Sequence, residues 1–142
     1  PEETTLEGFE SSWRTNALGL LVSAQAMFQD MSPQGRGNIV VIGATASIRG
    51  GATSTAFASA KAAQRSLAQS LARRFAPQGI HVSHIIIDGI IDLPRTREKR
   101  PDAPDDSYLQ PDDIADTVAK ITQQPRSAWT FEVDLRPHTE NW

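Results

Sequence analysis

Phe57 and Lys61 are the two residues of this sequence whose types and spacing bear most directly on chemistry. They are four residues apart in a stretch predicted to be helical, so both side chains lie on one helix face. Alanines at positions 60, 62 and 63 indicate a close-packed surrounding for Lys61, although a solvated helix lysine is the alternative. A phenyl ring has no proton to give, so Phe57 cannot act as a general acid.

The histidines and cysteines bear on metal and thiol chemistry. His81 and His84 are three residues apart in a predicted strand, hence on opposite faces, so they cannot ligate one metal ion together. The third histidine, His138, lies in the C-terminal tail. The sequence contains no cysteine, which excludes disulfides, thiol nucleophiles and thiolate zinc sites. We therefore expect no metal site.

A glycine-containing turn after a predicted strand could be mistaken for a phosphate-binding loop. It runs from Gly43 to Ser47 and is followed by Gly50 and Gly51. It lacks the second glycine that lets backbone approach a pyrophosphate, and no acidic ribose-binding residue follows about 20 residues later on a second strand. We reject a phosphate-binding role for this turn.

A run of basic residues is followed by a run of acidic ones within an irregular stretch rich in proline, arginine and aspartate: Arg95, Arg97, Lys99 and Arg100, then Asp102, Asp105 and Asp106. Such a charge run is typical of a solvated loop, and phosphate capture is the alternative. We expect residues 93–110 to form a mobile loop.

Composition and net charge indicate an ordinary globular domain. The 142 residues are 39% hydrophobic and 22% charged, with a formal net charge of -3. That charge gives no general attraction to nucleic acid or to an anionic membrane. No apolar run approaches the roughly 18 residues that a membrane helix needs. We expect a soluble protein, and the lack of cysteine is compatible with a reducing cytoplasm.

Hydrophobic spacing and turn residues predict alternating helices and strands. The two long predicted helices are 8–31 and 54–77, and the predicted strands are 39–42, 80–87 and 129–135. Pro111 and the two aspartates after it mark the start of a third main helix. This order predicts an α/β fold with parallel strands, in which the β-branched run 39–42 is buried on both faces.

Five stretches carry a resemblance to one family, and they occur in the order that the family has. They are 13–19, 37–47 with 56–63, 79–82, 88–89 and 111–115. The second of these resembles the middle of the short-chain dehydrogenase/reductase family, where a strand and a catalytic serine precede a Tyr-x-x-x-Lys motif that opens a helix. The resemblance covers essentially the whole chain.

The resemblance implies the C-terminal half of a doubly wound Rossmann-type parallel sheet, with about three strands and three main helices. We expect residues 1–142 to be a single partial domain in which 93–110 resembles the family's substrate lid. The family's N-terminal nucleotide-binding half, with its glycine-rich Thr-Gly-x-x-x-Gly-x-Gly turn, is absent from this sequence.

The resemblance also implies roles for four residues. The family's proton-donating tyrosine corresponds to Phe57, and Lys61 matches the lysine that lowers the tyrosine pKa and binds the nicotinamide ribose. The family serine falls on Ala44, so neighbouring Thr45 is our choice for the carbonyl-binding hydroxyl, with a structural strand-end threonine as the alternative. Asn16 matches the asparagine that supports a water relay beneath the lysine, and a buried structural hydrogen bond explains it as well.

For the cofactor, the resemblance implies NAD or NADP in the parent protein and none bound to this chain alone. Lys61, Asp88, Gly89 and Ile91 are the residues expected beside it. Asp88 replaces the family's proline, and Leu93 occupies the position of a threonine that binds pyrophosphate in the family. Both changes argue against tight cofactor binding.

Two functions follow from the resemblance. The first is an NAD(P)-dependent oxidoreductase that acts on a carbonyl or alcohol group, with this chain inactive by itself. The second is a catalytically inactive family member that serves as a dimeric binding or scaffold protein. Phe57, in the position of the family's tyrosine, is the residue that indicates it.

The family commonly pairs its two long helices across a twofold axis, so a homodimer through 8–31 and 54–77 is implied. Without upstream strands, the strand 39–42 is an open edge that we expect to be covered or swapped.

Overall fold

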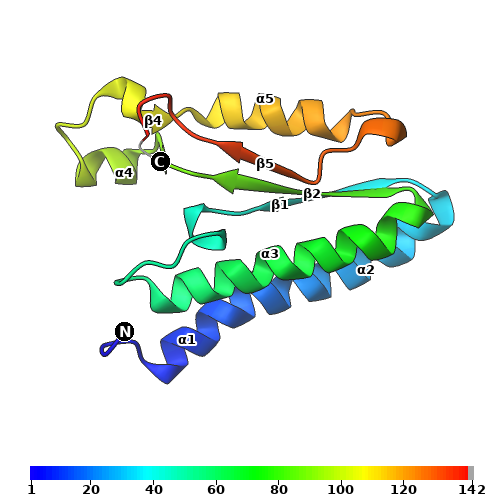
Figure 1. Ribbon diagram of the computed structural model, residues 1–142, viewed down its shortest axis with the longest axis horizontal. Coiled ribbons are helices and arrows are strands. Elements are labelled where there is room, and N and C mark those ends of the chain that lie inside the picture. Colours follow the sequence, from blue (N-terminus) through cyan, green and yellow to red (C-terminus); the bar gives the residue numbers. More distant parts are fainter. Residues whose placement is uncertain (141–142) are drawn as a thin grey trace.

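The structure is a computed structural model that describes residues 1–140, so Asn141 and Trp142 of the expected domain lie outside the described residues. A parallel sheet forms the middle layer, with the long helices α2 and α3 against one face and helix α5 against the other (Figure 1). None of the helices among residues 1–140 is long and apolar enough to cross a membrane. The arrangement confirms the predicted α/β fold class.

The sheet has the strand order β1-β2-β5, and both pairings are parallel as predicted. Strand β1 (Gly37–Ile42) runs beside β2 (Ile80–Ile87), which in turn pairs with β5 (Glu132–Leu135). The register places Ile42 opposite Ile85 and His84 opposite Glu132. Parallel register brings the carboxyl ends of all three strands to one edge, where ligands bind in open α/β sheets.

Burial on both faces belongs to β2 rather than to β1. All eight residues of β2 are buried, because helices cover both faces and a strand lies on each side. In β1, Ile39 and Val41 are buried but Ile42 is 45% exposed. The prediction for 39–42 therefore fails at its carboxyl end, since no other strand among residues 1–140 pairs with the outer edge of β1.

The first predicted helix is interrupted by a π-helical turn. Helix α1 (Leu6–Trp13) passes into the π-helical segment η1 (Arg14–Leu18) and then into α2 (Gly19–Gln34). The helix ends at Gly35, whose φ of 60° is left-handed. A π-helical turn leaves carbonyl groups out of the regular i to i+4 ladder and is frequent at functional sites.

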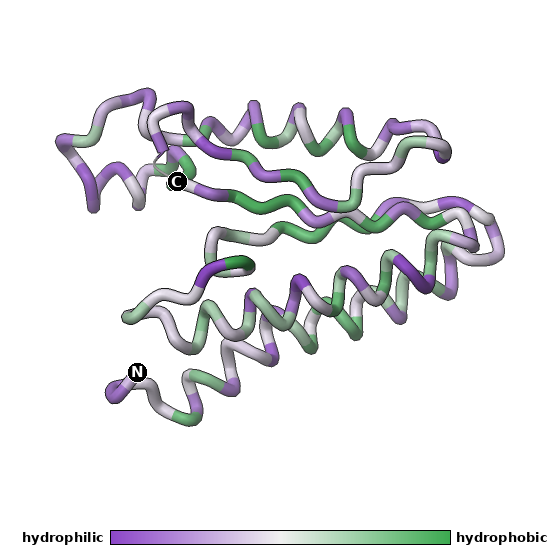
Figure 2. The backbone as a smooth tube through the Cα atoms, in the orientation of Figure 1, coloured by the Kyte–Doolittle hydropathy of each residue, from purple (hydrophilic) through white to green (hydrophobic). Residues whose placement is uncertain are grey.

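Helix α3 (Thr55–Phe75) packs on the sheet through small residues and then larger ones. Ala60 and Ala68 are fully buried, which lets the helix approach the strands closely, and Phe75 stacks on Phe28 of α2 with ring centroids 4.5 Å apart. The apolar core on this side includes these buried residues: Ala24, Ile39, Val41, Ala68, Leu71, Phe75, Ile80 and Val82. Figure 2 shows this hydrophobic layer between the helices and the strands.

A second core lies on the other face, under helix α5 (Pro111–Thr122). Its buried residues are Ile85, Ile87, Leu109 and Ile121. Strand β5 is shorter than predicted, because a 3-10 turn at Arg126–Ala128 follows Pro125 and Trp129 stacks on His81 instead of pairing as a strand residue.

Residues 93–110 are more ordered in secondary structure than a loop. They contain helix α4 (Pro94–Lys99) and strand β4 (Tyr108–Leu109), which pairs with β3 (Ile90–Ile91). Arg97 organises this segment by binding Asp92 at 2.6 Å and Asp105 at 2.5 Å. Its guanidinium also lies 4.1 Å from the Tyr108 ring centroid. That the segment moves as a lid stays a prediction.

Candidate active site at the carboxyl ends of the strands

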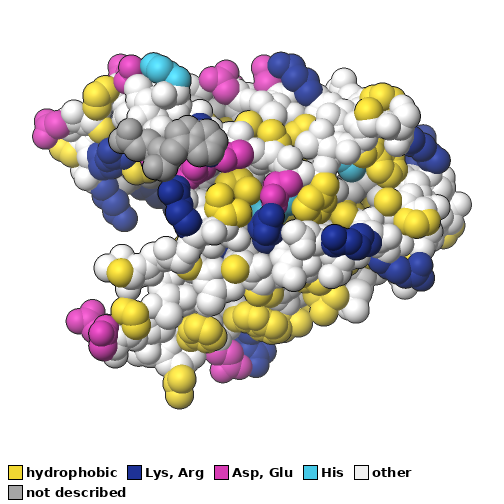
Figure 3. Space-filling view, viewed as in Figure 1, with side chains coloured by type: hydrophobic (Ala, Val, Ile, Leu, Met, Phe, Trp, Pro, Cys, Tyr) yellow, Lys and Arg dark blue, Asp and Glu magenta, His cyan; other side chains and the backbone are white. Residues whose placement is uncertain are grey.

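A cavity of about 910 Å³ opens where β1 and β2 end. Its walls come from η1, the segment after β1, the start of α3, and the β3–α4 region. Figure 3 shows this side of the molecule hollowed between α4 above and the start of α3 below. Six of the predicted site residues line the cavity: Asn16, Thr45, Phe57, Lys61, Gly89 and Ile91.

Lys61 lies in the cavity wall with its ammonium group held by two neutral acceptors. Nζ donates to the carbonyl oxygen of Ile42 at 2.9 Å and to Oε1 of Gln64 at 3.0 Å. An ammonium has three N–H donors, so one remains for a ligand in the cavity. Burial lowers the pKa of Lys61. The structure thus favours the close-packed environment over the solvated alternative.

Gln64 connects Lys61 to the π-helical turn, and sequence reasoning missed it. Its Nε2 donates to the main-chain carbonyl of Asn16 at 3.2 Å while its Oε1 accepts from Lys61. The side chain of Asn16 instead donates to the carbonyl of Ser12 at 2.9 Å, a bond within the helix. Asn16 therefore contributes its backbone to this network and its amide to the helix. Three-residue spacing from Lys61 on α3 is the signal that could have found Gln64.

Phe57 occupies the cavity wall in the first turns of α3 and is 44% exposed. The Lys61 ammonium lies 5.8 Å from its ring centroid, on the same helix face as the spacing predicts. No Tyr, His, Asp or Glu lines the cavity within residues 1–140. Lys61 is consequently the lining group that can hold a transferable proton near neutral pH.

Asp88 is buried beneath the cavity and does not line it. Its Oδ1 accepts a hydrogen bond from Thr45 Oγ1 at 2.5 Å, and its Oδ2 lies 3.3 Å from Arg136. Thr45 has a single hydroxyl proton, which is committed to Asp88 in this arrangement. A substrate carbonyl would therefore have to compete with Asp88 for Thr45, which favours a structural role for this threonine.

Gly89 and Gly43 admit no side chain. Gly89 has φ of 156°, and a Cβ there would lie 2.7 Å from Cδ of Pro137. A Cβ on Gly43 would overlap Nε2 of His84. Position 43 in the rejected phosphate-binding turn therefore requires glycine for a steric reason, since the imidazole of His84 leaves no room for a side chain.

His84 is fully buried under the cavity wall. Like Gln64, it is a residue near the site for which the sequence predicted no role. Its Nδ1 contacts Oε2 of Glu132 at 3.0 Å, whereas Nε2 has no hydrogen-bond partner among residues 1–140. Glu132 also accepts two bonds from Arg65, at 2.6 and 2.8 Å. Burial lowers the pKa of His84, opposed by the contact with Glu132.

Comparison with known proteins identifies the family. The model of the short chain dehydrogenase family matches residues 1–104, so this chain belongs to that family. An uncharacterized oxidoreductase of Staphylococcus aureus strain USA300 is 29% identical over 132 residues, which are 93% of this chain and 56% of that protein. A second one, from Staphylococcus saprophyticus, is 30% identical and covers 95% of this chain and 56% of its own length. The chain spans about half the length of these relatives.

Solved structures agree with this assignment. A short-chain dehydrogenase from Rhodopseudomonas palustris is 39% identical, with a TM-score of 0.77 over 96% of this chain and 55% of that one. An alcohol dehydrogenase from the archaeon Thermococcus sibiricus, in complex with 5-hydroxy-NADP, has a TM-score of 0.81 at 23% identity. It covers 99% of this chain and 58% of its own, and at that identity it shows the fold alone.

Proposed function

We propose that the protein containing this chain is an NAD(P)-dependent oxidoreductase that acts on a carbonyl or alcohol group. The observation that carries the proposal is Lys61, which points an incompletely used ammonium group into a cavity at the carboxyl ends of parallel strands. The Rhodopseudomonas palustris relative supports it by family, and NADP-type ligands occupy some solved structures of the same fold.

The residues present fit the nicotinamide end of such a cofactor. The free N–H of Lys61 can bind a ribose hydroxyl, and Gly89 and Ile91 leave an apolar wall beside it. When bound, the cofactor supplies or accepts the hydride. Gln64 and the Asn16 carbonyl keep Lys61 directed at this position, and the Phe57 ring shields the ammonium from water.

Lys61 takes over the proton in this proposal with the N–H that it otherwise donates to Gln64 Oε1, because its third N–H binds the ribose hydroxyl. With Phe57 in the tyrosine position, no phenol can protonate the substrate oxygen, and Lys61 has a pKa that burial lowers toward the working range of a general acid. A less suited donor slows the reaction, so turnover on the order of 10²- to 10⁴-fold below that with a phenol is expected.

The proposal includes a homodimer and a cytoplasmic location. Exposed hydrophobic side chains along α1 and α2 support pairing through this segment: Leu6 is 89%, Trp13 45%, Val22 56% and Met27 41% exposed. Hydrophobic side chains along the lower border of Figure 3 follow this segment. The lack of cysteine is compatible with a reducing compartment.

The alternative, an inactive dimeric binding or scaffold protein, is favoured by one observation. Phe57 removes the family's acid, and the same exposed hydrophobic side chains would serve a scaffold equally well. Either way, this chain alone lacks the family's phosphate-binding turn, so we expect it to be inactive without the remaining half of the domain.

Titration of the protein at its full natural length with NADH and NADPH separates the two functions. Nicotinamide fluorescence should rise with saturation below millimolar cofactor, and Lys61→Met should weaken the binding. Absence of binding at millimolar concentrations of both cofactors would remove the oxidoreductase and leave the scaffold.

A further inference from the structure

The cavity carries more positive charge than the proposed proton transfer needs. Lys61, Arg49 and Arg95 line it, and no Asp or Glu does so within residues 1–140. The whole chain is acidic, with a net charge of -3, so this local excess is the opposite of its overall balance. Lys and Arg side chains point into the hollow in Figure 3.

Arg95 has no acidic partner among the described residues, in contrast to its neighbour on α4. Arg97, two residues further on, binds two carboxylates and fixes the segment. The side chain of Arg95 lines the cavity and makes no ion pair or hydrogen bond with residues 1–140. The helix thus uses one arginine for its own anchoring and presents the other to the cavity.

Arg49 is also poorly compensated. Its only ionic contact within residues 1–140 is with Asp88 at 3.6 Å, and the side chain is 53% exposed. Asp88 meanwhile faces the closer Arg136 and accepts the Thr45 hydrogen bond, so its charge is shared. Arg49 belongs to the segment after β1 and Arg95 to α4, and both line the cavity.

We infer that Arg49 and Arg95 bind an anionic group of the substrate, a carboxylate or a phosphate, while the carbonyl or alcohol carbon lies beside Lys61 and Phe57. The inference rests on the proposed function and deepens it by naming the substrate class. Guanidinium groups bind carboxylate and phosphate oxygens through two parallel N–H donors, which gives direction as well as charge. The apolar wall of Phe57 and Ile91 then suits the carbon skeleton between the two ends.

The test is binding of three probes that share one ring: benzoate, phenyl phosphate and neutral benzamide. Isothermal titration with the protein at its full natural length is expected to show at least one anion binding about 10-fold or more tightly than benzamide. Arg49→Gln and Arg95→Gln should each remove about 10-fold of that preference, because hydrogen bonds to charged groups contribute that much. Lys99→Gln, which removes a charge from the same helix outside the cavity, should leave it unchanged.

A second titration distinguishes substrate from cofactor as the source of the negative charge. Cofactor affinity should change less than about twofold in Arg49→Gln and Arg95→Gln. If these variants lose cofactor affinity and keep the anion preference, the arginines serve the cofactor phosphates and the inference is wrong. Equal binding of all three probes, or binding of none to the unaltered protein, would also overturn it.

Failure of the proposed function looks different. Anion preference that depends on both arginines, without any binding of NADH or NADPH, would disprove the oxidoreductase and leave an anion-binding pocket. Circular dichroism melts of each variant show whether a loss of binding is a loss of fold.

Discussion

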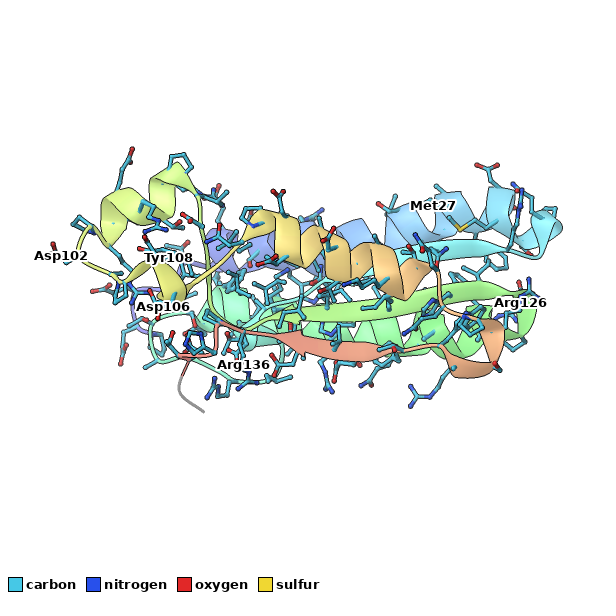
Figure 4. All side chains as sticks on the ribbon, turned by 90° about the horizontal axis from the view of Figure 1, so that it is seen from above. Met27, Asp102, Asp106, Tyr108, Arg126 and Arg136 are labelled. Carbon is cyan, nitrogen blue, oxygen red and sulfur yellow. The ribbon has the colours of Figure 1, made fainter. Side chains whose placement is uncertain are left out.

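The two ends of the parallel sheet differ in how completely their polar groups are paired. At the amino ends, Arg126 donates to the carbonyl of Gly35 at 2.6 Å and Ser32 donates to Gln78 at 3.1 Å, which closes the turns around the strands. At the carboxyl ends, Arg95 and Nε2 of His84 have no partner within residues 1–140. Figure 4 shows Arg126 at one end of the molecule and Asp102 and Tyr108 at the other. Paired groups therefore close the amino ends, whereas at the carboxyl ends the Arg95 guanidinium is left free to bind a ligand. Nε2 of His84 is fully buried and, with Nδ1 facing Glu132, is an acceptor rather than a donor.

Of the substitutions considered, Lys61→Met at the carboxyl ends of the strands should have the largest effect on activity. Removing the proton-holding ammonium is expected to lower kcat/KM of the full-length protein by about 10³-fold, within the usual range for loss of a general acid. Arg126→Gln at the amino ends should leave kcat/KM unchanged and lower the Tm instead. NAD(P)H oxidation followed at 340 nm measures kcat/KM, and thermal melts measure the Tm. Equal losses of activity in both variants would show that the ends do not differ in function.

Phe57→Tyr should raise activity rather than lower it. A phenol at this position lies one helical turn before Lys61, so it regains the arrangement that the family uses, and turnover should rise by about 10²-fold. Phe57→Leu, which adds no hydroxyl, is the matched control. An unchanged rate for the tyrosine variant would mean that position 57 does not face the reacting oxygen.

Gly43→Ala, at the carboxyl ends of the strands, should lower the free energy of unfolding. The new methyl group would overlap the imidazole of His84, at a cost of about 1 to 3 kcal/mol for overpacking. Gly50→Ala is the control, because nothing lies within 4 Å of a Cβ there. Chemical denaturation should show coupling between Gly43→Ala and His84→Ala, and additive effects would refute the contact.

Acid should weaken the fold through His84 and Glu132 in two separate ranges of pH, and this is the smallest effect. The pKa of His84 is lowered by burial, so the unfolded chain binds more protons just below about 6.5 and stability falls as the pH drops there. The pKa of Glu132 is lowered chiefly by Arg65, so its contribution is present above about 4.5 and is lost below that value.

His84→Gln tests the first range. The variant should lose the decline of Tm between about pH 6.5 and 5 while keeping the decline at lower pH. A decline of Tm that is unchanged in the variant would assign it to another group.

Periodicity was sufficient to predict the three-layer order, because β2 and the helices around it bury their apolar residues as their patterns indicate. It could not predict the π-helical turn at Arg14–Leu18, since apolar steps of three and four residues are the pattern of a continuous α-helix. It also missed α4, whose stability depends on long-range ion pairs of Arg97 rather than on an apolar face. The family motif located Lys61 and Phe57. Gln64 has only its spacing from Lys61 as a sequence signal, and Arg49 and His84 are recognised only by their three-dimensional partners.

The two hydrogen bonds between Arg65 and Glu132 have a consequence for Lys61. Arg65 comes one turn after Lys61 on α3, and Glu132 belongs to β5, two strands away from the strand whose carbonyl Lys61 contacts. A bidentate pair resists rotation of the helix about its own long axis. The rotation of α3 about its axis, and with it the direction of the Lys61 ammonium group, is therefore fixed by β5 at the opposite edge of the sheet.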